Sequence, residues 1–136
     1  MKYLASFILS VAGIVATATA GFAQQLPWPR LAEAEQTAGR QIFNQHCATC
    51  HAEKRAYGPS LRGVVGRPAG SLVEFPYSNE LKKSGLVWTE DNLRKWIADN
   101  AHMVPNTLMP HVSISDPAEQ IYLIAYLKTL KAPKVR

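Results

Sequence analysis

Two cysteines and a histidine lie close together in the run CATCH, as Cys47, Cys50 and His51, and the 136-residue sequence holds no other cysteine. A cysteine pair at this spacing occurs in redox-active dithiols, in zinc sites and in the covalent attachment of a c-type haem. A redox dithiol of the thioredoxin kind accompanies a strand–helix–strand pattern, and no strand pattern is visible here. A metal site and a haem site are the two remaining possibilities.

A zinc site would need a second pair of ligands, and His46, His102 and His111 do not form one at zinc-ligand spacing. Haem attachment needs only the CATCH run itself. Because residues three apart share one face of a helical turn, both thiols can reach the two vinyl groups on one side of a porphyrin. The run therefore predicts one covalent haem, bound through both cysteines, with His51 as an axial iron ligand.

Residues 1–23 have the composition of a secretory signal peptide, in which one lysine precedes an apolar run over residues 3–18 and small residues follow. We place the cleavage site after Ala23, with Ala20 as the alternative. A retained anchor is disfavoured because the apolar run is shorter than the ~20 residues that a membrane span needs. Residues 24–136 are then one exported domain, predicted to act in the periplasm, and export suits c-type haem, which is attached outside the cytoplasm.

The charge pattern argues against a nucleic-acid binder. The formal net charge is only +5, the lysines and arginines are scattered, and no basic run exceeds two residues. A domain of this length buries a modest core, to which a large flat cofactor would add apolar contact.

The elements that position the CATCH run are predicted to be helices separated by long loops. Residues 26–29 form a proline-containing leading segment, and a first helix covers residues 33–46, with Gly39 and Phe43 one turn apart. Residues 52–85 are rich in glycine, proline, serine and asparagine and are predicted to be loop with at most short turns.

Two further helices are predicted downstream, which makes the domain all-α. Thr89 is suited to cap a helix that runs to Asn100, and residues 103–114 contain two prolines and are predicted to be loop. A capping aspartate followed by proline, Asp116-Pro117, begins the last helix, which runs to about Lys131.

Short motifs in a constant order make the sequence similar to the class I cytochromes c, the family of mitochondrial cytochrome c and bacterial cytochrome c2. The resemblance covers residues 35–130. The matching runs around CATCH are Gly39 and Phe43, GPSL at 58–61, GR at 66–67, FPYS at 75–78, WT at 88–89, PNTLM at 105–109 and LIAYL at 123–127. It implies the fold of that family, in which the N- and C-terminal helices cross and helices and long loops wrap around one covalent haem c.

The resemblance also implies roles for residues outside the CATCH run. Met109 matches the second axial ligand, and Thr107 two residues before it completes the Thr-x-Met context that Met103 lacks. Met103 also follows the predicted Thr89 helix too closely to reach over the haem.

Four more residues match the haem surroundings of the family. Pro59 matches the proline whose carbonyl accepts a hydrogen bond from the haem histidine, which fixes the orientation of the ring. Tyr77 and Trp88 match residues that hydrogen-bond a buried haem propionate, and Arg67 matches one that offsets the charge of that propionate.

Several positions depart from the family pattern. Trp96 replaces a tyrosine beside the methionine sulfur, and because indole donates through one nitrogen only, that hydrogen bond is expected to be absent or differently aimed. Asn106 replaces a glycine in the methionine loop but tolerates the left-handed conformation. Leu81 replaces a polar residue of a buried water network, which predicts a drier pocket.

An iron with both axial positions filled by protein has no open site for oxygen or peroxide, so the resemblance implies a soluble, monomeric electron carrier and not an enzyme. Its partners would be redox proteins, a reductase and an oxidase or dehydrogenase, including transient docking on membrane complexes. The surface expected around the exposed haem edge, where partners would dock, carries few charged residues, with Leu108 in place of a lysine and His46 before Cys47. The alternatives are a haem subunit or domain partner of a periplasmic oxidoreductase and a ligand-sensing haem module.

Overall fold

The computed structural model describes residues 28–52 and 57–132, and every element named within them is a helix. In chain order the helices are α1 (Trp28–His46), α2 (Ala48–His51), α3 (Asn79–Lys83), α4 (Glu90–Ala98), α5 (Asn100–Met103) and α6 (Pro117–Thr129). Extended pairing in these two ranges is limited to an isolated bridge between Pro68 and Val87. The all-α prediction is therefore confirmed.

The predicted signal peptide, residues 1–23, lies outside the described residues. Across the part of the chain that is described, we find no helix with the length and apolar character needed to cross a membrane.

Helix α1 begins earlier than predicted, because Trp28 and Pro29 belong to its first turn rather than to a leading segment. Proline is tolerated there, since the first N–H groups of a helix have no partner within it and the fixed φ angle of proline already suits a helix. Leu26 and Pro27, the rest of that predicted segment, lie outside the described residues.

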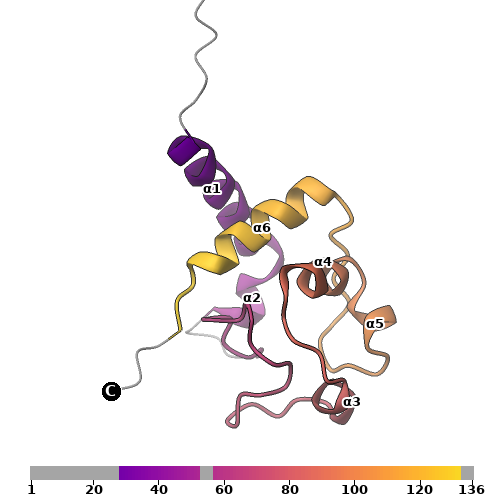
Figure 1. The fold of residues 1–136 in the computed structure, drawn as a ribbon. Helices are drawn as coiled ribbons and strands as arrows, with labels where there is room; N and C mark the ends of the chain where they lie inside the picture. The colour runs from indigo at the N-terminus through magenta and orange to yellow at the C-terminus, as the bar shows by residue number, and fades with distance from the viewer. Residues whose placement is uncertain (1–27, 53–56, 133–136) are drawn as a thin grey trace, which may run out of the picture.

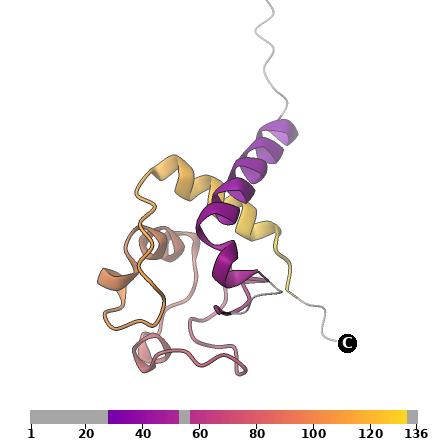
Figure 2. The ribbon, with the colours of Figure 1, turned by 180° about the vertical axis from the view of Figure 1, so that it is seen from behind.

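Helices α1 and α6 cross, as the resemblance implied (Figures 1 and 2). Gly39 permits the close approach, because a Cβ atom at this position would overlap the carbonyl oxygen of Tyr122 and lie 2.9 Å from Tyr126 Cβ. The rings of Phe43 and Tyr126 pack with their centroids 5.3 Å apart, and Leu123 is 1% exposed. Gly39 and Phe43 therefore lie on the face of α1 that packs against α6.

Helix α6 begins at the predicted cap and ends two residues before the predicted Lys131. The Asp116 carboxylate accepts a hydrogen bond from Ala118 N at 2.7 Å, and the helix ends at Thr129. Helix α4 packs beside α6, so that the buried apolar side chains of the three long helices form most of the core: Ile42, Phe43, Leu93, Trp96, Ile97, Leu123, Ile124 and Leu127.

The helix predicted from Thr89 to Asn100 is two helices. Thr89 caps α4 by accepting a hydrogen bond from Asn92 N, as predicted, but α4 ends at Ala98. Asp99 has φ −160° and ψ 84°, and its carboxylate accepts a hydrogen bond from His102 N at 2.9 Å, which caps α5. An aspartate that bonds the backbone ahead of it competes with helix continuation, and this local competition breaks the predicted helix.

The long segment before α4 is mostly loop, as predicted, apart from the short helix α3. Ser78 caps that helix by accepting a hydrogen bond from Leu81 N at 3.1 Å. Leu81 itself is 6% exposed and joins the core. Residues 53–56 of the predicted loop lie outside the described residues.

Candidate haem-binding site

The CATCH run continues α1 into one further helical turn. Cys47 N donates to Phe43 O at 2.8 Å, and His51 N donates to Cys47 O at 2.9 Å, so Cys47, Cys50 and His51 lie on one tight turn. Both cysteines are partly buried and free. Burial, and secondarily the neighbouring Cys50, raises the pKa of the Cys47 thiol to about 11.

The described residues give no support to the two rival interpretations of the cysteine pair. A redox dithiol needs a thiol whose pKa is lowered, so that the thiolate forms near neutral pH, whereas the pKa of Cys47 is raised. A zinc site needs a cluster of ligands, and within residues 28–52 and 57–132 no three His, Cys, Asp or Glu residues are placed to hold a metal ion.

His51 is oriented by the segment that follows the CATCH turn. Its Nδ1 lies 2.8 Å from the carbonyl oxygen of Pro59, which only accepts, so Nδ1 carries the proton. Burial lowers the pKa of His51, which favours the neutral ring. A neutral imidazole protonated at Nδ1 keeps a free lone pair at Nε2, which is the form that binds a metal.

Gly58 leaves room for that imidazole. A Cβ atom at Gly58 would lie 2.7 Å from Cε1 and 2.8 Å from Nδ1 of His51, closer than real Cβ atoms approach. The histidine ring therefore depends on the absence of a side chain at position 58.

Met109 lies beside Trp96, and here the structure differs from the sequence expectation. The indole Nε1 of Trp96 donates to Met109 Sδ at 3.2 Å, so the hydrogen bond expected to be absent or differently aimed is present. Trp96 is 6% exposed, and Met109 is partly buried. A thioether sulfur has two lone pairs, so one can accept from the indole while the other stays available to a metal.

The methionine loop adopts the expected left-handed turn. Asn106 has φ 63°, a conformation that asparagine tolerates better than most residues. The hydroxyl oxygen of Thr107 lies 3.5 Å from Met109 N, at the outer limit of a hydrogen bond. Met103 ends α5, outside this loop.

Sequence reasoning missed Asn100, which is fully buried and carries no accessible surface. Its side chain bonds the backbone of the methionine loop at Met109, Pro110 and Val112. The sequence offers one signal for this role. Asn100 directly follows an aspartate that can break a helix, and it precedes a loop in which two prolines have no backbone N–H to donate. Neither hydrophobic periodicity nor motif spacing singles out this asparagine.

The three residues predicted around a propionate are brought to one region. Trp88 N donates to Arg67 O at 2.9 Å, and the Trp88 ring packs edge-on against Trp96 with centroids 5.1 Å apart. Burial raises the pKa of Tyr77, while the positive charge of Arg67 opposes that rise. The Arg67 guanidinium donates to the carbonyl oxygens of Arg62 and Ser60, at 3.0 and 2.8 Å.

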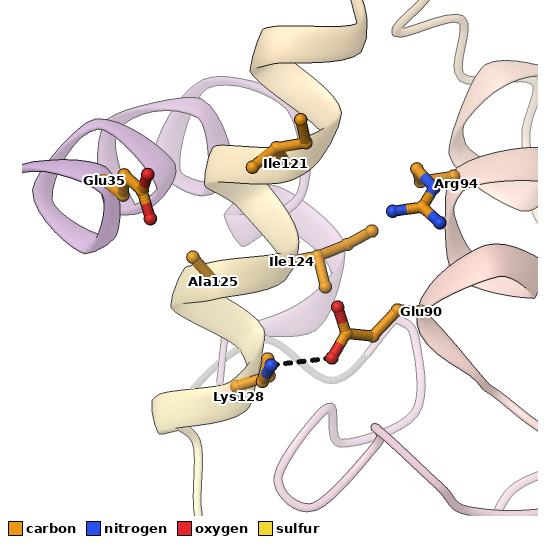
Figure 3. Close-up of a pocket in the computed structure, with 7 residues that line it drawn as sticks. All are labelled: Glu35, Glu90, Arg94, Ile121, Ile124, Ala125 and Lys128. Carbon is orange, nitrogen blue, oxygen red and sulfur yellow. Dashed lines mark hydrogen bonds and ion pairs between the residues drawn. The ribbon is translucent and has the colours of Figure 1, made fainter. Parts of the chain in front are cut away.

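A separate hollow of about 190 Å³ lies between α1, α4 and α6 and contains none of these residues (Figure 3). Lys128 and Glu90 form an ion pair of 2.6 Å within it, with Arg94 beside them on α4. The Arg94 guanidinium pairs with Asp91 on the same helix at 3.7 Å, and the hollow lies outside the CATCH turn and the methionine loop.

The donor set fits a c-type haem. Two free thiols on one turn can form thioethers, the adjacent imidazole presents an unprotonated nitrogen, and the residue that packs against this ring is a glycine. The sulfur of Met109 offers a soft ligand of the kind that pairs with histidine in cytochromes c.

The known proteins with similar sequences are also cytochromes c. The family model for cytochrome c matches residues 36–131. A cytochrome c2 iso-2 from Magnetospirillum fulvum is 44% identical over 87 residues, which are 62% of this chain and 91% of that protein. A cytochrome c2 from Rhodopila globiformis is 42% identical over 96 residues, which are 68% of this chain and 91% of that protein.

A solved structure has a similar fold. The structure of cytochrome cH from Methylobacterium extorquens aligns with a TM-score of 0.65 at 45% identity, and it covers 69% of this chain and 97% of its own.

Proposed function

We propose that this chain, which belongs to the cytochrome c family, shuttles single electrons through a haem held between His51 and Met109. Members of the family carry electrons on one covalently attached haem c and are not enzymes. Cys47 and Cys50 form the thioether bonds in this proposal. The bound haem supplies a one-electron couple at the iron.

The observation that carries the ligand assignment is the 3.2 Å hydrogen bond from Trp96 Nε1 to Met109 Sδ. It holds the thioether in one orientation, with a lone pair left for the iron. A sixth position filled in this way favours electron transfer over oxygen chemistry or ligand sensing, which need that position open.

The other residues of the site orient the His51 imidazole and shield the site from water. Pro59 O fixes the imidazole of His51, and the absence of a side chain at Gly58 keeps that ring in place. Trp88 and Leu81 are 7% and 6% exposed, so they exclude water from this side of the domain. In this proposal Trp88 and Tyr77 also hydrogen-bond a propionate, whose charge Arg67 offsets.

The partners are proposed to be redox proteins with an apolar docking patch. Residues 100–115 carry no lysine, arginine, aspartate or glutamate, and Leu108 in this segment is 71% exposed. Charge near a contact steers association, and an uncharged rim leaves more of the docking energy to apolar contact. With the N-terminal segment read as a signal peptide, the proposed carrier is a soluble periplasmic monomer.

Replacing each methionine in turn tests the ligand assignment. The Met109→Ala protein should lose the weak far-red absorption band of an iron–methionine bond, bind external imidazole and have a lower midpoint potential. The Met103→Ala protein is the matched control and should keep the band. If Met103→Ala loses the band and Met109→Ala retains it, the assignment is wrong. A wild-type protein without the band would instead favour the ligand-sensing or enzyme-subunit alternatives.

A further inference from the structure

Asn100 is the most completely buried polar side chain in the described part of the chain. Its Nδ2 group donates to the carbonyl oxygens of Met109 at 3.0 Å and Pro110 at 3.2 Å, and its Oδ1 accepts from Val112 N at 3.2 Å. Both amide hydrogens and the amide oxygen are therefore used. The reversed amide would set its oxygen against two carbonyl oxygens, so these partners define its orientation.

The segment that Asn100 holds makes few bonds of its own. Within the described residues, Thr107 N donates to Val104 O and Ile114 N donates to Ile97 O, while residues 108–113 take no part in backbone–backbone hydrogen bonds. Pro110 has no N–H to donate. The Asn100 side chain thus replaces the missing backbone pairing along the stretch that contains Met109.

A second buried amide fixes the far end of the same loop. Gln120, on α6, is 9% exposed, and its Nε2 donates to Ile114 O at 2.8 Å. The loop is therefore tied to α5 by Asn100 and to α6 by Gln120. Gln120 bonds the loop at Ile114, five residues beyond Met109, whereas Asn100 bonds Met109 itself.

We propose that Asn100 is the positioning residue that keeps the methionine loop closed, so that it sets how readily an external ligand displaces Met109; this rests on Met109 being the sixth iron ligand, as proposed above. Opening the loop exposes the three backbone groups that Asn100 satisfies. Without Asn100 the closed loop leaves those partly buried groups without their partner, so the balance moves towards the open form. External ligands bind the open form and gain apparent affinity in proportion to its population.

Titration of the ferric holoprotein with imidazole measures this balance. The Asn100→Ala protein should bind imidazole with an apparent affinity about tenfold above wild type, the factor expected when at least one partly buried backbone group loses its hydrogen-bond partner. It should also show a weaker far-red band. Asn100→Asp keeps an acceptor for Val112 but removes the donors, so it should resemble Asn100→Ala if the bonds to Met109 and Pro110 matter.

The matched control is Asn92→Ala. Asn92 is only partly buried, unlike Asn100, but its Nδ2 likewise donates to a backbone carbonyl, Val87 O, at 2.8 Å, and it has no hydrogen bond to the methionine loop. This variant should bind imidazole like wild type. If Asn100→Ala binds imidazole no more tightly than Asn92→Ala, while wild type shows the far-red band, the inference is overturned.

Amide hydrogen exchange gives a readout that does not depend on the sixth ligand. The Val112 amide should exchange slowly in wild type, because its N–H is held by Asn100 Oδ1. Exchange of Val112 at the rate of an exposed amide in wild type would overturn the inference even if the Asn100 variants fail to fold. A different outcome is a wild-type protein that lacks the far-red band while the Val112 amide is protected from exchange. The contacts of Asn100 would then be present, but Met109 would not be the iron ligand. The inferred control of ligand exchange would be overturned together with that ligand assignment.

Discussion

Replacing Trp96 by phenylalanine removes the indole N–H that lies 3.2 Å from Met109 Sδ and keeps an aromatic ring on α4. The positive end of the N–H dipole faces the sulfur that we propose to bind iron. It disfavours the extra positive charge of the oxidised iron, so its removal should stabilise the oxidised state and lower the midpoint potential.

The size of this shift follows from the burial of the pair. Trp96 is 6% exposed, so water cannot readily replace the lost donor. A neutral hydrogen bond contributes about 1 kcal/mol to stability. If the bond stabilises the reduced protein by about 1 kcal/mol more than the oxidised protein, its loss lowers the midpoint potential by about 40 mV, since a tenfold change in relative affinity is about 59 mV for one electron. The smaller ring should also lower the free energy of unfolding by about 1–3 kcal/mol through lost packing against Trp88.

Redox titration of the purified holoprotein measures the shift, with Tyr126→Phe as the control. Tyr126 lies at the crossing of α1 and α6, where its ring packs on Phe43, so that variant should keep the wild-type potential. An unchanged or higher potential in Trp96→Phe, with the far-red band intact, would refute the electrostatic argument.

Three further predictions follow from separate parts of the fold. Gly39→Ala should lower the free energy of unfolding by about 1–3 kcal/mol in urea titrations, because its Cβ would overlap the Tyr122 carbonyl oxygen and force α1 away from α6; a change under about 1 kcal/mol would contradict the observed helix contact. Haem should stay with the wild-type chain through denaturation and acid–acetone extraction, whereas Cys47→Ala or Cys50→Ala should lower the yield of holoprotein; haem that washes out of the wild type would end the attachment assignment. The electron-transfer rate with the natural partner should fall only slightly as salt rises, because residues 100–115 carry no lysine, arginine, aspartate or glutamate and charges farther off are screened beyond about 8 Å; a steep fall would show that basic residues surround the docking site.

Signals that act within one turn of chain were predicted from the sequence. The caps at Thr89 and Asp116 are present, because each depends on one side-chain oxygen and a backbone N–H two or three residues later. The differences are also local: Pro29 is predicted to lie in a leading segment but fits the first turn of α1, and Asp99 is predicted to lie within a helix but ends α4 and caps α5.

The sequence by itself determined the haem chemistry and the family, since the CATCH run places both thiols and an imidazole on a single turn whatever surrounds it. Only the tertiary structure decided how the methionine side of the site is held. Trp96 reaches the sulfur of a residue thirteen positions away, and Asn100 satisfies a loop up to twelve positions downstream. Such contacts depend on how the loop folds back over α4 and α5, because backbone groups that find no partner within their own segment must be satisfied by whichever buried side chain the packing brings to them.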